Sequence, residues 1–165
     1  MELPKRKPIR LPEHDYSSPG AYFITICTHA RRCILSTITV GEGLAPPVVT
    51  LSSVGRCVKE QILALPARYP TVHIDNYVIM PNHVHLLLTF RMASGGASPS
   101  PTLFDVVRVL KSLSTRLSRA QLGDLPLWQR SFHEHVIRNE HDYREIWEYI
   151  DANPARWAED RYYAP

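Results

Sequence analysis

Short apolar runs along the chain predict four β-strands. They are expected at residues 21–28, 72–79, 83–90 and 132–138, where β-branched and aromatic residues are concentrated. Pro81 and Asn82 separate the second run from the third and favour a tight turn, so these two strands should be antiparallel neighbours. The stretch 33–51 contains further β-prone runs broken by glycine and proline, which predicts either a small hairpin or an irregular insertion.

Three other segments repeat apolar residues at the helical period. Their N-terminal caps are expected at Ser52 or Ser53, at Thr102 and at Asn139, and Pro66 and Pro154 are expected to end the first and the third helix. The second helix is the longest, and its apolar stripe consists of Leu103, Val106, Val107, Leu110, Leu113 and Leu117. Between the third strand and this helix, residues 91–101 read as a flexible linker of small residues and proline.

The resulting order, β-α-β-β-α-β-α, predicts an α+β fold. Its first six elements match the ferredoxin-like split βαβ arrangement, in which helices cover one face of a four-stranded antiparallel sheet. The added C-terminal helix must then pack elsewhere, and a position near the third strand would bring its side chains close to that strand. We divide the chain into an N-terminal arm at 1–18, a folded domain at 19–157 and a tail at 158–165.

Length and composition are those of a single globular domain. The chain has 165 residues, of which 44% are hydrophobic and 21% charged. No apolar run approaches the roughly 20 residues that cross a membrane, and the N-terminus lacks the apolar stretch of a signal peptide. The three cysteines show no Cys-x-x-Cys spacing, so we expect reduced thiols in a cytoplasmic protein.

The positive charge is concentrated at the N-terminus. Within the first twelve residues, four cations against Glu2 give 4 − 1 = +3, which equals the formal net charge of the whole chain; they are Lys5, Arg6, Lys7 and Arg10. A basic arm punctuated by proline often lies along a nucleic-acid backbone. A solvated tail is the alternative.

Two histidines on the third predicted strand suggest a metal site. His83 and His85 are two residues apart, so both imidazoles leave the same face of the strand, while Val84 and Leu86 leave the other. Two neighbouring imidazoles form half of a metal site. The alternative is a structural pair with one exposed ring and one ring hydrogen-bonded in the core.

The last predicted helix offers Tyr149 and Asn153 to complete that site. Its core stripe consists of Tyr143, Ile146, Trp147 and Ile150. At 100° per residue, Tyr149 lies roughly 110° from the centre of this stripe, and Asn153 shares its flank one turn later. An ordinary flank position is the alternative for Tyr149. The residue before a proline disfavours helical angles, which argues against helical spacing at Asn153.

Together these groups would suit phosphoryl transfer. A metal held by two imidazoles and an amide oxygen keeps positions open for phosphate oxygens and stabilises transition-state charge. A phenol with a free pKa near 10 needs activation to act as a nucleophile, and its product would be a covalent phosphotyrosine. By ligand preference alone, imidazoles favour zinc, manganese or another transition ion over magnesium.

Four stretches resemble the HUH-type single-tyrosine transposases, in the REP-associated tyrosine transposase branch of the IS200-like family. They are SSPGAYFITICT, YVIMPNHVHLLL, LWQRSFHEHVIRN and DYREIWEYIDANPARW, which span most of the chain in the expected order. The resemblance implies that His83, His85 and Asn153 bind Mg²⁺ or Mn²⁺, and that Tyr149 is the nucleophile. The stretches 33–51 and 91–101 do not match the family closely.

The activity that the resemblance implies is cleavage and rejoining of single-stranded or hairpin DNA, such as REP-like repeats or transposon ends. Tyrosine would keep a 5′-phosphate and release a 3′-OH, and the protein would be a monomer or a homodimer without membrane contact. Two other functions remain open from the residues. One is a ferredoxin-like module that binds nucleic acid without chemistry, and the other is a metal hydrolase that uses bound water.

Further residues are candidates for DNA contact. Beside the N-terminal arm these are Arg108, Lys111 and Arg119 on the long helix, together with Arg130 and Arg138. Tyr22 and Phe23 could stack on bases, although at least one of them is expected in the core. In a second His-x-His motif, Glu134 and His135 could support the metal ligands or contact DNA. A satisfied polar edge is the simpler interpretation.

Overall fold

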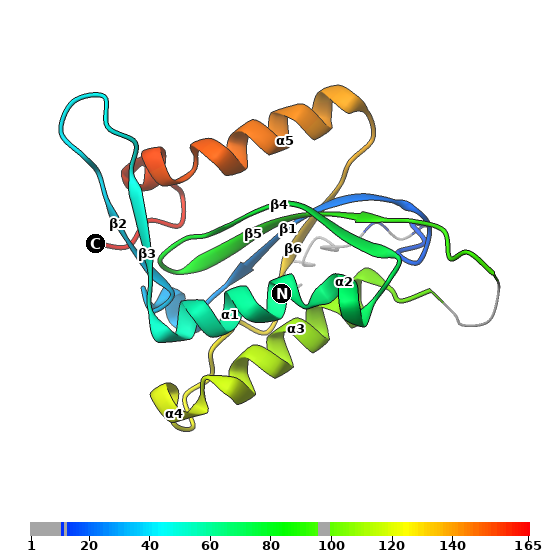
Figure 1. The fold of residues 1–165 in the computed structure, drawn as a ribbon, viewed down its shortest axis with the longest axis horizontal. Helices are drawn as coiled ribbons and strands as arrows, with labels where there is room; N and C mark the ends of the chain where they lie inside the picture. The colour runs from blue at the N-terminus through cyan, green and yellow to red at the C-terminus, as the bar shows by residue number, and fades with distance from the viewer. Residues whose placement is uncertain (1–10, 12, 96–99) are drawn as a thin grey trace, which may run out of the picture.

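The computed structural model describes residues 11, 13–95 and 100–165 and contains a four-stranded antiparallel sheet. The strands are β1 (Gly20–Cys27), β4 (Val72–Ile79), β5 (His83–Phe90) and β6 (His133–Val136). Their order across the sheet is β4-β5-β1-β6 (Figure 1). The first and third strands in sequence therefore lie in the centre, as in the ferredoxin-like arrangement that the sequence predicts.

Helices cover both faces of the sheet (Figure 1). The helices α1 (Ser53–Leu63) and α3 (Leu103–Leu117) pack on one face, and α5 (Glu140–Ala152) lies over the other. Shorter helical turns are α2 (Leu65–Arg68), α4 (Arg119–Leu122), η1 (His29–Arg31) and η2 (Pro154–Glu159). The added C-terminal helix thus packs across the sheet from the ferredoxin-like pair.

The helix caps follow from the local sequence. Ser52 Oγ accepts a hydrogen bond from the Gly55 N–H at 3.0 Å, and Thr102 caps α3 in a reciprocal capping box. Asn139 caps α5, as expected. Pro66 does not end α1, because the helix already stops at Leu63 and the proline lies in the first turn of α2, where no N–H is needed.

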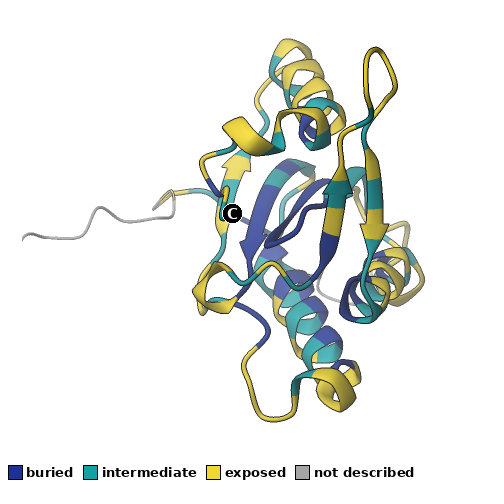
Figure 2. Cartoon of the chain, turned by 90° about the vertical axis from the view of Figure 1, so that its left-hand side faces the viewer, coloured by how far each residue is buried: buried dark blue, intermediate teal, exposed yellow. Residues whose placement is uncertain are grey.

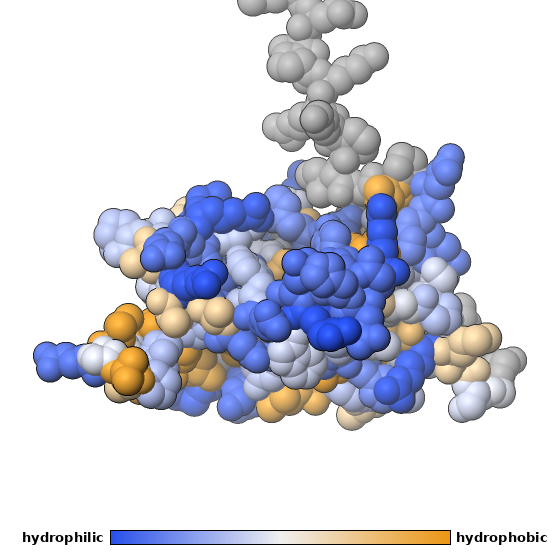
Figure 3. Space-filling model, turned by 90° about the horizontal axis from the view of Figure 1, so that it is seen from above, coloured by the Kyte–Doolittle hydropathy of each residue, from blue (hydrophilic) through white to orange (hydrophobic). Residues whose placement is uncertain are grey.

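The stretch 33–51 forms a hairpin from β2 (Ser36–Thr39) and β3 (Val48–Leu51). Its base is tied to the β4–β5 turn, since the Leu35 N–H donates to Pro81 O at 3.0 Å. The hairpin projects from one end of the molecule (Figure 1), and apolar surface gathers at that end in Figure 3. At its tip, Leu44 is fully exposed.

Alternation along β1 and β5 separates a hydrophobic core from a polar face. The core lies between the sheet and the α1–α3 pair, and its strand residues include Ile24, Ile26, Val84, Leu86 and Leu88, all with 0% exposure. Figure 2 shows these strands as the buried centre of the molecule, with exposed outer helices. The intervening residues of both strands face α5, which places His83 and His85 beneath that helix.

Among the described residues, no helix combines the length and the apolar character that crossing a bilayer requires.

Candidate metal and nucleophile site

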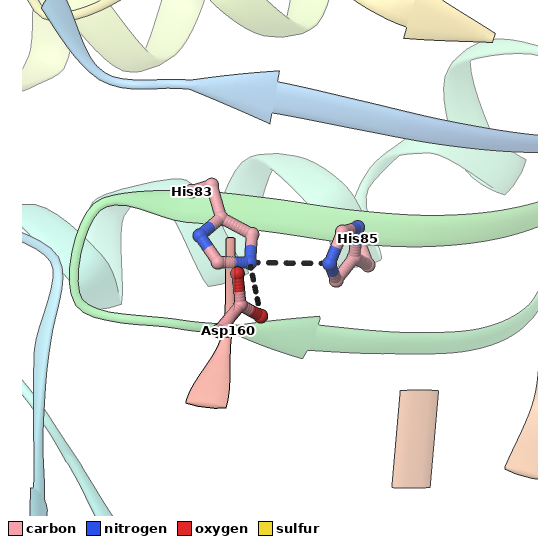
Figure 4. Close-up of side chains that lie close together, drawn as sticks. All are labelled: His83, His85 and Asp160. Atoms are coloured by element: carbon pink, nitrogen blue, oxygen red, sulfur yellow. Dashed lines mark hydrogen bonds and ion pairs between the residues drawn. The ribbon is translucent and has the colours of Figure 1, made fainter. Parts of the chain in front are cut away.

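His83 and His85 are both buried and face each other. Their exposures are 0% and 1%, and the two Nε2 atoms lie 3.1 Å apart (Figure 4). The rings leave the same face of β5, as the strand period predicts. Because neither ring is exposed, the structural alternative of one exposed and one core histidine is wrong.

Hydrogen bonds to the other ring nitrogens fix these orientations. Asn82 donates through Nδ2 to the Tyr162 carbonyl at 2.7 Å, so its Oδ1 is the atom that accepts from His83 Nδ1 at 2.9 Å. A neutral His83 protonated on Nδ1 presents the lone pair of Nε2 toward its partner. On the other ring, Thr25 Oγ1 lies 2.8 Å from His85 Nδ1. Both rings are thus held with Nε2 toward a common point.

Tyr149 reaches the same point from α5. Its hydroxyl lies 3.5 Å from His85 Nε2, within the same chain. Phe23 packs beside both rings, with centroid distances of 5.1 Å to His85 and 6.0 Å to Tyr149. The Tyr149 side chain is nevertheless partly open, with 41% exposure. The convergence of phenol and imidazoles that the helical period predicts is present.

Asn153 lies one turn beyond Tyr149 and is buried with 3% exposure. Its angles are helical (φ −58°, ψ −43°) even though Pro154 follows, so the expected proline effect does not break the spacing. Its Oδ1 is buried and has no hydrogen-bond partner among the described residues. Such an orphaned acceptor costs free energy unless another group satisfies it.

Residues after 157 also belong to the site, although no sequence pattern predicts it. After η2 the chain turns back, and Asp160 Oδ2 comes within 3.9 Å of His83 Nε2 (Figure 4). The Tyr162 ring packs against His83 at 4.7 Å and is 3% exposed. The segment expected as a tail therefore covers one side of the histidine pair. No periodicity connects Asp160 to the strand, since a turn of 3-10 helix intervenes.

Burial governs the protonation of the site. It lowers the pKa of His83 to about 4, although the nearby Asp160 carboxylate opposes the shift. Burial, followed by the neighbouring His83, also lowers the pKa of His85 well below its usual value. The pKa of Tyr149 is raised, mainly by burial and then by Asp160. At neutral pH the site therefore holds two neutral imidazoles and a protonated phenol.

These shifts predict that acid destabilises the metal-free protein. The unfolded chain binds a proton at histidine near pH 6.5, whereas folded His83 resists protonation down to about 4. Stability is therefore complete above pH 6.5 and is lost as pH falls toward 4. From pH 7 to 5, His83 alone should remove about 1–2 kcal/mol from the free energy of unfolding. Urea titrations with chelator would measure this loss.

A His133→Ala variant, which removes an exposed histidine of β6, is the control for that experiment. A free energy of unfolding that stays constant from pH 7 to 5 would show that the buried rings are not held neutral.

The donor set fits a divalent cation. Ligands at adjacent positions of an octahedral ion with bonds of about 2.1 Å lie about 3 Å apart, close to the 3.1 Å between the Nε2 atoms. Ligand atoms of His83, His85 and Asp160 all lie within 4.8 Å of one another. Asn153, whose side chain acts on the pKa of both His83 and Tyr149, adds a further oxygen through its unpartnered Oδ1. This group of side chains can hold a metal ion.

A groove of about 630 Å³ gives access to this group from solvent. It runs between α5 and η2, and Tyr149 and Asn153 form part of its wall. Arg156 and Arg161 line it together with the carboxylates of Glu145, Glu148, Glu159 and Asp160. The half-exposed Tyr149 side chain thus borders a groove that can hold a ligand larger than water.

Five of the predicted DNA-contacting cations are among the described residues, and none of these five lines the groove. Lys5, Arg6, Lys7 and Arg10 fall outside the described residues. Arg108, Lys111 and Arg119 belong to α3 and α4, across the sheet from α5 (Figure 1). The Lys111 ammonium is engaged by the carbonyls of Gln129 and Arg130, at 2.6 and 3.0 Å. Arg130 and Arg138 are exposed next to β6.

The second His-x-His motif makes separate contacts. His135 Nε2 bonds the Asp142 carboxylate at 2.9 Å, and Tyr16 donates to Glu134 Oε1 at 3.1 Å. No hydrogen bond or ion pair joins His135 or Glu134 to the buried histidines within the described part of the chain. Of the two aromatics on β1, Tyr22 is core with 0% exposure, whereas Phe23 lines the site.

Known proteins resemble this chain in sequence and in fold. No protein-family model matches the chain. An uncharacterized protein of Haemophilus influenzae is 33% identical over 173 residues, which cover 96% of this chain and 93% of that protein. The chain is also similar to the solved structure of a REP-associated tyrosine transposase bound to a REP hairpin, with a TM-score of 0.62 and 22% identity over 89% of this chain and 73% of that one.

A second solved structure, described as a candidate transposase from Deinococcus radiodurans, has a TM-score of 0.51 and 21% identity over 86% of this chain and 96% of that one. The resemblance stated from sequence is thus confirmed in the fold. The chain belongs to one family with the Haemophilus influenzae protein, and its fold is that of the REP-associated tyrosine transposase.

Proposed function

We propose that this protein is a metal-dependent DNA strand transferase that cuts and rejoins single-stranded or hairpin DNA through a phosphotyrosine at Tyr149. One observation carries the proposal. The Tyr149 hydroxyl lies 3.5 Å from an imidazole nitrogen that itself lies 3.1 Å from a second one, and both imidazole rings are buried. A nucleophile beside a ready pair of metal ligands is the arrangement that this chemistry requires.

His83, His85 and Asn153 are the proposed ligands of Mg²⁺ or Mn²⁺. The two Nε2 lone pairs and the orphaned amide oxygen support this assignment, and Asp160 is an additional carboxylate within reach. When bound, the ion would polarise the scissile phosphate and lower the pKa of the phenol. The phenol needs this activation by a cation because burial raises the pKa of Tyr149.

In the proposed reaction, Tyr149 Oη forms a bond to phosphorus and the P–O3′ bond breaks. The phenolic proton passes through solvent to the leaving 3′-oxygen, so the products are a 5′-phosphotyrosine and a free 3′-OH. The reverse reaction, with another 3′-OH as nucleophile, rejoins the strand. The Tyr149 hydroxyl and both imidazoles of the proposed site come from one chain.

The DNA substrate is proposed from two supports. The structurally similar REP-associated transposase was solved with a REP hairpin, and this chain shares its fold. The exposed Arg130 and Arg138 lie near β6 and remain proposed DNA contacts. We propose that the basic arm at 1–18 also contacts DNA. We propose that the catalytic domain comprises residues 19–157 together with Asp160 from the segment at 158–165. A supporting role for Glu134 and His135 remains a proposal.

The test is a denaturing gel of the purified protein mixed with a labelled hairpin oligonucleotide. With Mn²⁺ we expect a labelled species of protein mass, and with chelator none. Cleavage without a protein-linked product would instead indicate a hydrolase that uses water. Binding without cleavage in either condition would indicate a module that holds DNA and performs no chemistry.

A further inference from the structure

A second pocket lies at the opposite end of the sheet from the histidine pair. It has a volume of about 570 Å³ and is formed where α2 leads into β4 and where the chain leaves β5. Three basic side chains line it: Arg68 at the end of α2, His73 on β4 and Arg91 just after β5. The proposed reaction uses none of them.

The charge of this pocket is entirely positive. Its described lining contains no carboxylate and comprises Arg68, Tyr69, Pro70, Thr71, His73, Arg91, Met92, Ala93, Ser94, Gly95, Ser100 and Pro101. The adjoining linker, residues 91–101, contains no acidic residue anywhere in its sequence. An uncompensated pair of arginines in a concave site favours an anionic ligand.

The two arginines are free to bind such a ligand. Arg108, Arg119 and Arg144 each form an ion pair with a carboxylate. Arg68 contacts only the amide oxygen of Gln61, at 3.4 Å, and the Arg91 guanidinium has no partner among the described residues. A guanidinium binds phosphate oxygens through two parallel N–H groups, so this pair suits a phosphate better than a single point charge would.

Other lining groups suit the remainder of a nucleotide. The hydroxyls of Thr71, Ser94 and Ser100 can donate hydrogen bonds to phosphate or sugar oxygens. Tyr69 is half-buried, and Met92, with 81% exposure, adds apolar surface at the rim. Cations, hydroxyls and an aromatic ring in one concave site are the groups that contact a nucleic-acid backbone.

The distance between this pocket and the proposed reaction centre determines how long a DNA stem must be to reach both. β5 has eight residues, so at about 3.3 Å per residue its ends lie about 23 Å apart. His83 begins the strand and Arg91 follows its last residue. Arg91 is eight residue steps, about 26 Å, from His83, and duplex DNA rises about 3.4 Å per base pair, so a stem that starts at the histidine pair spans the distance to the pocket in about seven to eight base pairs.

We propose that the Arg68–Arg91 pocket binds a backbone phosphate of the DNA stem, about seven to eight base pairs from the cleavage site. This rests on the proposed function, which supplies the DNA and its placement at Tyr149. The pocket would then act as a gauge of stem length, because short stems cannot reach it.

The test compares hairpins with stems of four and twelve base pairs that share the same loop and single-stranded foot. Fluorescence anisotropy with chelator present measures binding without chemistry. We expect the Arg68→Ala, Arg91→Ala double variant to bind the long stem about tenfold more weakly than wild type, with a salt dependence lower by about one to two phosphate contacts. Binding of the short stem should change by less than twofold.

An Arg56→Ala, Arg144→Ala double variant is the matched control, because both arginines are exposed, lie outside the pocket and remove the same charge. It should bind both stems within twofold of wild type. Equal losses on both stems in the pocket variant, or none on either, would overturn the proposal. A third outcome would also overturn the proposal. If adenosine monophosphate binds the wild type but not the pocket variant, while the two proteins bind the long stem equally well, the pocket is a site for free nucleotides.

The proposed function is tested separately, by measuring the protein–DNA adduct that the wild type forms with the same long hairpin and Mn²⁺. If the wild type forms the adduct but the pocket variant binds the long stem as tightly as the wild type does, only the proposal for the pocket is rejected. A wild type that binds neither hairpin rejects both proposals.

Discussion

A Tyr149→Phe variant should form no covalent adduct with hairpin DNA, a loss of at least about 10³-fold in the rate, while its DNA affinity stays within about twofold of wild type. The substitution removes only the hydroxyl that lies 3.5 Å from His85 Nε2. The ring packs at 5.3 Å from His85 and 6.0 Å from Phe23, and phenylalanine keeps both contacts. The measurement is the labelled protein band on a denaturing gel with Mn²⁺, together with anisotropy for binding.

Tyr163→Phe is the matched control for this variant. Its ring packs against Trp157 at 5.1 Å near the same end of the molecule, it is 44% exposed, and its hydroxyl has no contact with the histidines. Adduct formation should be unchanged. An adduct that persists in Tyr149→Phe at more than a few per cent of the wild-type rate would mean that another group is the nucleophile.

Replacing His83 with alanine should produce the second large effect, a loss of at least about 10²-fold in Mn²⁺ affinity and a comparable or larger loss of cleavage. The substitution removes one of two nitrogens 3.1 Å apart and leaves His85 without its counterpart. It also removes a buried ring from contact with Tyr162, so circular dichroism must confirm that the variant folds. Calorimetric titration of Mn²⁺ into the protein without DNA measures the affinity directly.

His133→Ala provides the comparison from the second His-x-His motif. This histidine is exposed on the edge strand β6, in the same spacing as His83, and Thr25 of β1 lies between it and His85 in the strand register. It should leave both Mn²⁺ affinity and cleavage within twofold of wild type. A folded His83→Ala protein that binds Mn²⁺ as wild type does would show that the buried histidines are structural.

Local sequence rules were enough to predict the parts of the site that lie on regular elements. The period of a strand places His83 and His85 on one face, and the period of a helix places Tyr149 and Asn153 on one flank. Caps at Ser52, Thr102 and Asn139 fix where the helices begin. These relations hold because each depends on residues within one turn or one strand.

The parts that were missed depend on where the chain travels between elements. Asp160 and Tyr162 reach the histidines only because the backbone reverses after η2, and no periodicity describes that reversal. The basic side of α3 stays a predicted DNA surface, although α3 packs across the sheet from Tyr149 and Lys111 is bound to backbone carbonyls. Which face a helix turns toward a sheet depends on tertiary packing.

Mapping the attachment point of trapped DNA tests the central claim most directly. After reaction with a hairpin oligonucleotide and Mn²⁺, the protein would be digested with nuclease and protease, and the modified peptide would be identified by mass spectrometry. We expect a 5′-phosphodeoxynucleotide on Tyr149, in the peptide from α5, and none when chelator replaces the metal. The same modification on a different residue, such as Tyr143 or Tyr162, would contradict it.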